Sequence, residues 1–262
     1  MKVQGDLIVM LLYERRQAII AMLSKNGSAS VRDLADRLGV STVTIRRDLN
    51  ALEEDGLIVK THGGAVILGH DTEPALKLSE RERMYIEEKR RIGKTAAKLV
   101  QPGTTLIMDE GSTCLEIARQ IKDIPNVTVI TNGIRVAAEL LGTNVNLVVI
   151  GGVCDQQNTV LYGPDTESAY KRIRADIYFM GIDAFSEKDG IMDGSYLQVS
   201  LKNLKANAVQ RVIGVANGAK FGKRAMSLIG PITMLDALVT EEPISDELRI
   251  CLNKHAIECI QA

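Results

Sequence analysis

Short apolar runs alternate with helical stretches from residue 104 onward, and this alternation constrains the fold more than any other feature of the chain. The runs lie at 105–108, 127–130, 147–150, 177–182, 211–216 and 237–240. Nearly continuous apolar residues are typical of strands that are buried on both faces, as in parallel sheets covered by helices. The pattern therefore predicts an α/β domain with a parallel sheet, whose ligands would bind at the carboxyl ends of the strands.

The loop after the first run, from Asp109 to Thr113, has the composition of a phosphate-binding turn. Gly111 frees the backbone, and Ser112 and Thr113 offer hydroxyl groups. The helix that is expected to follow would present unpaired N–H groups and the positive end of its dipole. The same residues also fit an ordinary helix cap, because they match neither a Walker motif nor GxGxxG, and both interpretations stay open.

Polar or glycine residues also follow the later strands. The candidates there are Asn132, Gly151, Asp183 and Lys220. A lysine in this position suits a phosphate or a sugar hydroxyl, although a single lysine is more often plain surface. These loops predict a ligand site at one edge of the sheet.

Three short helices precede this domain. They are expected at 14–24, at 31–38, and from Ser41 to Glu54 or Asp55. Ser30 would cap the second helix, and Gly39 would allow a sharp turn before the third. Adjacent arginines, Arg46 and Arg47, face away from the apolar side of the third helix. This spacing predicts a helix-turn-helix that places its third helix in the major groove, and a plain bundle or a protein-docking module remains the alternative.

The expected DNA contacts follow from the N-terminal half of that helix, which reads bases in such motifs. Val43, Thr44 and Arg47 are assigned to base edges, and Thr42, Arg46 and Asn50 to phosphates. Strand-like residues on both sides of Gly63-Gly64 predict the hairpin of a winged helix. The full set of expected DNA-binding residues is Ser41, Thr42, Val43, Thr44, Arg46, Arg47, Asn50, Lys60, Thr61 and His62.

Composition excludes several other classes of protein. The net charge of −1 gives no general attraction to nucleic acid, and aromatic residues at 3% disfavour base stacking on single strands. The four cysteines are widely spaced and form no CxxC motif, so we expect no metal and a reducing cytoplasm. The apolar run Leu7–Leu12 is too short to span a bilayer, so no membrane is expected.

These patterns divide the chain into four parts. Residues 1–12 are expected to form an N-terminal extension, with a natural start at Met10 as the alternative. Residues 13–68 are assigned to the winged helix-turn-helix, 69–85 to a linker, and 86–262 to the α/β domain. The charged stretch Glu80-Arg81-Glu82-Arg83 is interpreted as solvated helix surface.

Several motifs resemble the DeoR family of bacterial repressors. They are Glu14-Arg15-Arg16, Val40-Ser41, Thr44-Ile45-Arg46-Arg47-Asp48-Leu49 and Lys60-Thr61-His62-Gly63-Gly64-Ala65, together with the strand-end loops of the larger domain. The resemblance implies a sensor domain similar in fold to ribose-5-phosphate isomerase that responds to phosphorylated sugars. It implies that Asp109, Gly111, Ser112 and Thr113 hold the phosphate end, and that Asn132, Gly151, Asp183 and Lys220 surround the sugar. Glu110 and Cys114 depart from the small or hydroxyl residues that are common at those positions.

The function expected from these observations is that of a DNA-binding regulator without enzymatic activity or a cofactor. Its partners would be double-stranded operator DNA and a small effector. A homodimer or homotetramer would place two helix-turn-helix units on one face of the DNA. Repression of a carbohydrate operon is favoured by the resemblance, and activation stays open. The alternative is a sugar-phosphate isomerase fused to a DNA-binding domain, although Ser186 lies where related isomerases carry a second aspartate.

Overall fold

The computed structural model describes residues 12–26, 28–54, 58–61, 63–67, 78–156, 158–241 and 243–262. The chain divides into two compact units, Met1–Pro74 and Ala75–Ala262, which we describe separately. The expected extension at 1–12 lies almost wholly outside the described residues, as does His62. The expected linker at 69–85 is described only from residue 78.

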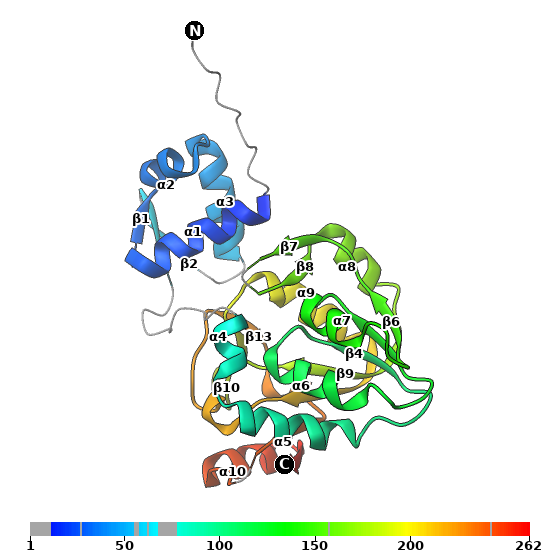
Figure 1. The fold of residues 1–262 in the computed structure, drawn as a ribbon. Coiled ribbons are helices and arrows are strands. Elements are labelled where there is room, and N and C mark those ends of the chain that lie inside the picture. The colour runs from blue at the N-terminus through cyan, green and yellow to red at the C-terminus, as the bar shows by residue number, and fades with distance from the viewer. Residues whose placement is uncertain are drawn as a thin grey trace. The chain divides into compact units, whose positions relative to one another are not determined.

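The described residues of the first unit form three helices and a small antiparallel sheet (Figure 1). Its elements are α1 (Leu12–Asn26), β1 (Ser28–Ser30), α2 (Val31–Leu38), α3 (Thr42–Glu54), β2 (Ile58–Thr61) and β3 (Gly64–Ile67). The strand order is β1-β3-β2. The predicted helices and hairpin are therefore confirmed, whereas β1 was not predicted because a strand of three residues shows no alternation.

Caps define the helix-turn-helix, because they satisfy the backbone groups at helix ends. The Ser30 hydroxyl accepts a hydrogen bond from the backbone N–H of Asp33 at 3.0 Å, which begins α2. Gly39 ends α2 in the left-handed region at φ 64°, where glycine carries no steric penalty. Ile19, Leu34 and Ile45, one from each helix, have no exposed surface and form the centre of this unit.

A parallel sheet of seven strands organises the second unit. Its strands are β4 (Thr105–Met108), β5 (Thr128–Thr131), β6 (Asn146–Val149), β9 (Ala175–Gly181), β12 (Val209–Val215), β14 (Ala237–Thr240) and β15 (Glu258–Gln261), in the spatial order β15-β14-β12-β9-β4-β5-β6. Six of these strands match the predicted apolar runs, and β15 was missed because Glu258-Cys259-Ile260-Gln261 is not a continuous apolar run.

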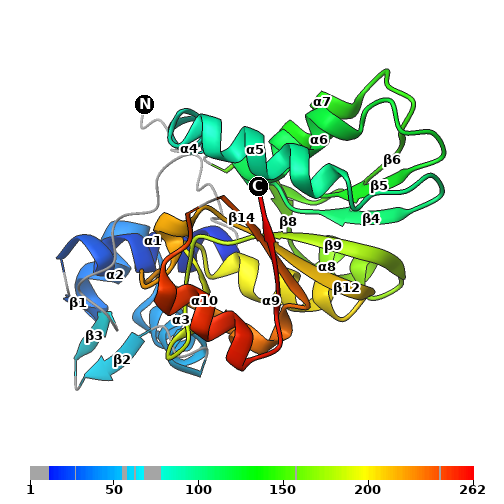
Figure 2. The same cartoon turned by 90° about the horizontal axis from the view of Figure 1, so that it is seen from below.

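Helices cover both faces of this sheet, as predicted. Figure 2 shows α5 (Ile86–Ala97), α6 (Ser112–Ile121) and α7 (Ile134–Leu140) on one face, and α8 (Pro164–Tyr170) and α9 (Leu197–Ala206) on the other. The remaining helices of the unit's described residues are α4 (Leu78–Arg83), α10 (Asp246–Lys254) and two short 3₁₀ turns. Helices α4, α8, α9 and α10 were not predicted as defined elements.

Two smaller antiparallel sheets are separate from the parallel sheet. One is the hairpin β7 (Val153–Asp155) and β8 (Val160–Tyr162). The other is a three-stranded sheet of β10 (Ala184–Ser186), β11 (Gly190–Asp193) and β13 (Ser227–Gly230). Neither was predicted, because their strands have three or four residues and mixed polarity.

The order in which the chain adds strands to the sheet reverses between β4 and β9. These two strands are neighbours, although β5 to β8 lie between them in sequence. From β4 the chain proceeds to β5 and β6 on one side, and from β9 to β12, β14 and β15 on the other. Ligands of open α/β sheets bind beyond the carboxyl ends of strands at such a reversal. Asp109 follows β4 and Asp183 follows β9, so two predicted site residues flank this position.

Candidate nucleic-acid interface and effector site

The exposed face of α3 carries most of the residues that we expect to contact DNA. The exposed members, including the cap, are Ser41, Thr42, Val43, Arg46, Arg47 and Asn50. Val43 is 71% exposed, which is unusual for a valine in a helix whose opposite face is fully buried. The ion pairs in the described part of this unit involve Arg15, Arg16 and Lys60 as cations, so Arg46 and Arg47 remain available to an external anion.

The first turn of α3 is fixed by a hydroxyl cap. The Ser41 Oγ accepts a hydrogen bond from the backbone N–H of Thr44 at 3.1 Å, and the two hydroxyl oxygens lie 2.9 Å apart. Thr44 is half-buried, in contrast to its neighbours on the exposed face. Its hydroxyl therefore takes part in the cap, and its methyl group is the portion left to meet a base.

Lys60 of β2 is held by the end of α3. Its ammonium donates to Asn50 Oδ1 at 2.8 Å and lies 2.9 Å from Glu53 Oε2, while its backbone N–H donates to Glu53 Oε1 at 2.9 Å. The hydrogen bonds from Lys60 lower the pKa of Glu53. Two expected phosphate contacts, Lys60 and Asn50, are thus paired with each other, and Thr61 is exposed at the end of the same strand.

A buried carboxylate joins α1 to α3, and sequence reasoning assigned it no structural role. Asp48 is fully buried and accepts hydrogen bonds from Arg15 Nε at 2.6 Å and from Arg15 Nη2 at 3.3 Å. Arg16 Nε lies 3.5 Å from Asp48 Oδ1. The signal was present in the sequence, because Asp48 falls on the same helical face as Ile45 and Leu49.

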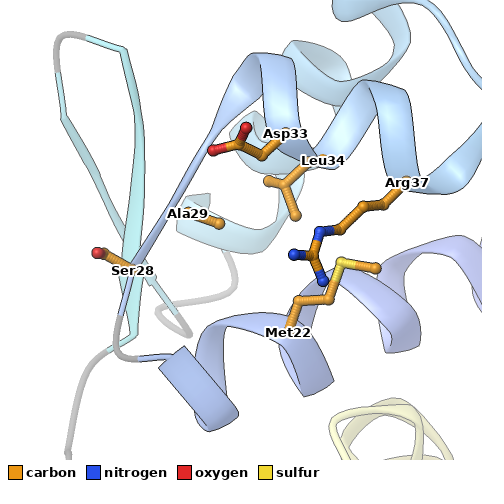
Figure 3. Close-up of a pocket in the computed structure, with 6 residues that line it drawn as sticks. All are labelled: Met22, Ser28, Ala29, Asp33, Leu34 and Arg37. Atoms are coloured by element: carbon orange, nitrogen blue, oxygen red, sulfur yellow. The ribbon is translucent and has the colours of Figure 1, made fainter.

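The first unit also contains a small hollow beside α2 (Figure 3). It is lined by Met22, Ser28, Ala29, Asp33, Leu34 and Arg37. Its volume of about 80 Å³ is well below the roughly 300 Å³ at which ligand pockets begin. This hollow is therefore too small to hold a sugar phosphate.

In the second unit, Asp109 is the centre of a buried charge network at the carboxyl end of β4. It accepts hydrogen bonds from the Tyr178 hydroxyl at 2.7 Å, the Gly181 N–H at 3.0 Å and Lys205 Nζ at 2.7 Å. Lys202 Nζ lies 3.3 Å from its second oxygen. Burial alone would raise the pKa of Asp109, but the charges of Lys205 and Lys202 outweigh it and lower the pKa. Asp109 therefore stays ionised and holds two lysines in place.

Those lysines come from α9, which the sequence did not predict. Lys202 and Lys205 are three residues apart, so they lie on one helical face, and both are buried. Lys202 Nζ is 2.8 Å from Asp193 Oδ2 and also donates to the Gly181 carbonyl. Burial would lower the pKa of Lys202, but the surrounding carboxylates, Asp193 first, raise it well above its usual value. Burial would also lower the pKa of Lys205, but nearby charges, Asp109 first, raise it, so both ammonium groups favour the protonated form.

Several buried side chains among the described residues of this unit have polar atoms without partners. Within the described part of the chain, Glu110 Oε2 and both amide atoms of Asn217 lack a hydrogen bond. Glu110 follows Asp109 at the end of β4, and Asn217 lies just beyond β12. Burial, and then the charge of Asp109, raise the pKa of Glu110. Unpaired buried polar groups are costly and rare.

Asp183, beyond β9, is paired with an arginine from α4. Arg81 Nη1 donates to Asp183 Oδ1 at 3.0 Å, and the Gly194 N–H donates to the other oxygen at 3.1 Å. Burial would raise the pKa of Asp183, but the charge of Arg81 lowers it. The interpretation of residues 80–83 as solvated surface is therefore wrong for Arg81, whose side chain is 19% exposed, although Arg83 is exposed. A helix of six residues gives too little periodicity to separate the two.

The other expected effector residues lie at the same edge but differ in their surroundings. Gly111 is the N-cap of α6, where it supplies no side-chain bond to the first turn. Ser112 is buried there and Thr113 is half-buried. Lys220 is half-buried in the 3₁₀ turn after β12, and its positive charge contributes to the lowered pKa of Asp183.

Asn132 and Gly151 are engaged by neighbouring elements. The buried Asn132 amide donates to the Leu161 carbonyl at 2.7 Å and accepts from the Tyr170 hydroxyl at 3.0 Å. The Gly151 carbonyl accepts a hydrogen bond from the Thr166 hydroxyl at 2.6 Å. These two residues therefore fix the β5 and β6 side of the site.

The described residues contain no group of three or more His, Cys, Asp and Glu side chains that could hold a metal ion. No helix among them has the length and apolar character needed to cross a membrane.

Comparison with solved structures gives only a weak likeness. Ribose 5-phosphate isomerase from Plasmodium falciparum is 17% identical, with a TM-score of 0.37 over 51% of this chain and 52% of that one. At this level the likeness says nothing about chemistry.

Sequence comparisons cover both units. Residues 15–70 match the family described as the DeoR-like helix-turn-helix domain, and residues 84–242 match the DeoR C terminal sensor domain. The "Putative aga operon transcriptional repressor" of Escherichia coli O157:H7 is 34% identical over 94% of this chain and 93% of the relative. The "Glycerol-3-phosphate regulon repressor" of Escherichia coli K12 is 29% identical over 94% and 97%. These relatives are named as regulators, which contradicts the isomerase alternative. The chain therefore belongs to the DeoR family of transcriptional regulators, with a DNA-binding helix-turn-helix and a sensor domain.

Proposed function

We propose that the protein is a cytoplasmic repressor of a carbohydrate-utilisation operon and that a phosphorylated sugar sets its affinity for the operator. The names of the two relatives above, an aga operon repressor and a glycerol-3-phosphate regulon repressor, support this assignment. A homodimer or homotetramer would present two α3 helices to half-sites on one face of the duplex. Residues 13–68 would bind DNA, residues 69–85 would connect the two domains, and residues 86–262 would sense the effector.

The exposed face of α3 supports a major-groove reading mode. Arg47 would donate two N–H hydrogen bonds to O6 and N7 of a guanine, and Val43 would pack on a thymine methyl group. Thr42, Arg46 and Asn50 would contact phosphates, with Lys60 exchanging Glu53 for a phosphate oxygen on binding. His62 and Thr61 would complete the wing.

The effector proposal rests on the cationic side chains and the unpaired buried polar atoms near the carboxyl ends of β4 and β9. Five cationic side chains gather there, from α4, α5, α9 and the turn after β12. They are Arg81, Lys89, Lys202, Lys205 and Lys220. Their carboxylate neighbours are Asp109, Asp183, Asp193 and Glu110, and burial and then the charge of Asp109 raise the pKa of Glu110. An anionic ligand rich in hydroxyl groups would balance the charge and satisfy Glu110 and Asn217.

Within this site we assign different tasks to the predicted residues. Gly111, Ser112 and Thr113 would bind the phosphate through the open N-terminus of α6. Asp109 would act indirectly, by fixing Lys202 and Lys205. Asp183 and Lys220 would hydrogen-bond the sugar, and Asn132 and Gly151 would shape the wall beside it.

A thermal-shift screen of the full chain against sugar phosphates and their unphosphorylated counterparts tests this assignment. A ligand that binds only the folded protein raises its stability by about 2.7 kcal/mol at a concentration of about 100 times the dissociation constant. We expect stabilisation by at least one sugar phosphate and none by its unphosphorylated counterpart. Equal stabilisation by both members of each pair would contradict the phosphate assignment.

A further inference from the structure

Helix α4 brings one arginine into the effector site from the segment that follows the first unit. Arg81 Nη1 donates to Asp183 Oδ1 at 3.0 Å, and Nη2 donates to Asn158 Oδ1 at 3.0 Å. Asn158 lies in the turn between β7 and β8. One guanidinium therefore ties α4 to the carboxyl end of β9 and to the neighbouring hairpin.

A lysine of α5 also holds the C-terminal end of α4. Lys89 is buried, and its ammonium donates to the backbone carbonyls of Arg81 and of Met84, the latter at 2.7 Å. A cation at this position satisfies carbonyls that the helix leaves open. At the other end of α4, Leu78 is only 2% exposed. The position of α4 is thus set by its contacts with the sensor unit.

Arg81 also retains unused bonding capacity. Its Nε is buried and lacks a hydrogen-bond partner among the described residues. Glu110 and Asn217 follow β4 and β12, the two strands that flank β9, and each also has a buried polar atom without a partner in the described part of the chain. The negative charge of Glu110 raises the pKa of Arg81. An unpaired buried N–H is costly, and a guanidinium binds phosphate or carboxylate oxygens through two donors at once. A ligand oxygen that accepts from Nε would remove this cost.

We infer that Arg81 is an effector-binding residue that couples occupancy of the effector site to the segment leading to the DNA-binding unit. This inference rests on the proposed function, since it takes the carboxyl ends of β4 and β9 to be the effector site. Ten residues, 68–77, separate the end of β3 from α4 in sequence. A ligand that engages Arg81 changes the bonds that hold α4, and it can shift operator affinity only by binding two arrangements of α4 unequally.

The test uses the full chain and compares Arg81→Gln with Arg83→Gln. Arg83 lies on the same short helix with an exposed side chain, so it controls for lost charge and helix propensity. The probes are glycerol 3-phosphate, ribose 5-phosphate and fructose 6-phosphate, each paired with its unphosphorylated form. Calorimetry measures probe affinity, and fluorescence anisotropy measures binding to a duplex that the unmodified chain recognises.

We expect Arg81→Gln to weaken the tightest probe by about 10- to 100-fold, the range for a hydrogen bond to a charged group, and to remove the probe's effect on duplex affinity. Arg83→Gln should preserve both. If Arg81→Gln does not fold, Arg81→Lys replaces it, because lysine keeps the positive charge but lacks the planar set of N–H donors of a guanidinium. That variant should bind the probe more weakly and show a reduced response.

Wild-type probe affinity in Arg81→Gln, or a loss no greater than in Arg83→Gln, would overturn the inference and leave the proposed function intact. If only unphosphorylated sugars bind the unmodified chain, the phosphate assignment fails, and the same pair of variants measured on that sugar still decides the role of Arg81. Absence of binding by every probe would contradict both proposals.

Discussion

Replacing Asp48 by asparagine should loosen the first unit, because it removes the carboxylate that joins α1 to α3. The three side chains of this cluster are largely buried, with exposed fractions of 1% for Asp48, 12% for Arg15 and 18% for Arg16. Removing one partner of a buried ion pair costs about 3–5 kcal/mol, because it leaves an uncompensated charge. Since the arginines retain some contact with water, we expect a loss of about 2–4 kcal/mol.

Hydrogen exchange measured by mass spectrometry on the full chain is the suitable assay, since a protein of two units does not unfold in one step. A loss of this size accelerates exchange of the α3 amides by roughly 30- to 1,000-fold, at about 1.4 kcal/mol per factor of ten. Asp36→Asn, an exposed position on α2, is the matched control. The double variant Arg15→Gln, Asp48→Asn should lose less than the sum of the single changes. Exchange in Asp48→Asn that equals the control would refute this account of how α3 is held.

Three further predictions concern the interface and the pocket. Arg47→Ala should weaken operator binding by about 1–3 kcal/mol in an anisotropy titration, whereas the exposed Lys171→Ala should not, and equal affinities would remove the base-reading role of Arg47. Lys220→Ala should leave operator affinity unchanged and reduce the response to the effector, so an unreduced response would show that the pocket is misplaced. Because the pKa of Glu110 is raised from its ordinary value of 4.5, its ionisation destabilises the folded state increasingly as pH rises above that value. Glu110→Gln should therefore gain stability in thermal melts at pH 8 and show no gain near pH 4, and a gain that is the same at both would contradict the assigned pKa.

The parts of the fold that sequence reasoning found are those in which each residue carries an unambiguous local signal. The predicted bounds of α2 coincide with the observed Val31–Leu38, because Ser30 and Gly39 mark its two ends chemically. The central strands were found because a strand buried on both faces is apolar at nearly every position. The exposed face of α3 followed from its helical period alone.

The missed residues are those whose role depends on a distant partner. Lys202 and Lys205 carry the pattern of a solvated helix face, and only Asp109 and Asp193, on other elements, make their burial possible. Arg81 looked like part of a charged surface for the same reason, since its partner Asp183 lies 102 residues away in sequence. A single chain shows the period of an element but not which charges will meet across the sheet.

The most direct test of the central claim is the affinity of the full chain for operator duplex, measured across a salt series with and without the tightest-binding sugar phosphate. A cationic helix in the groove predicts that the logarithm of the association constant falls linearly with the logarithm of salt concentration. Control by the sensor unit predicts that the sugar phosphate lowers that affinity by about 5- to 150-fold at each salt concentration. Binding that does not respond to salt, or a bound sugar phosphate that leaves operator affinity unchanged, would contradict the account.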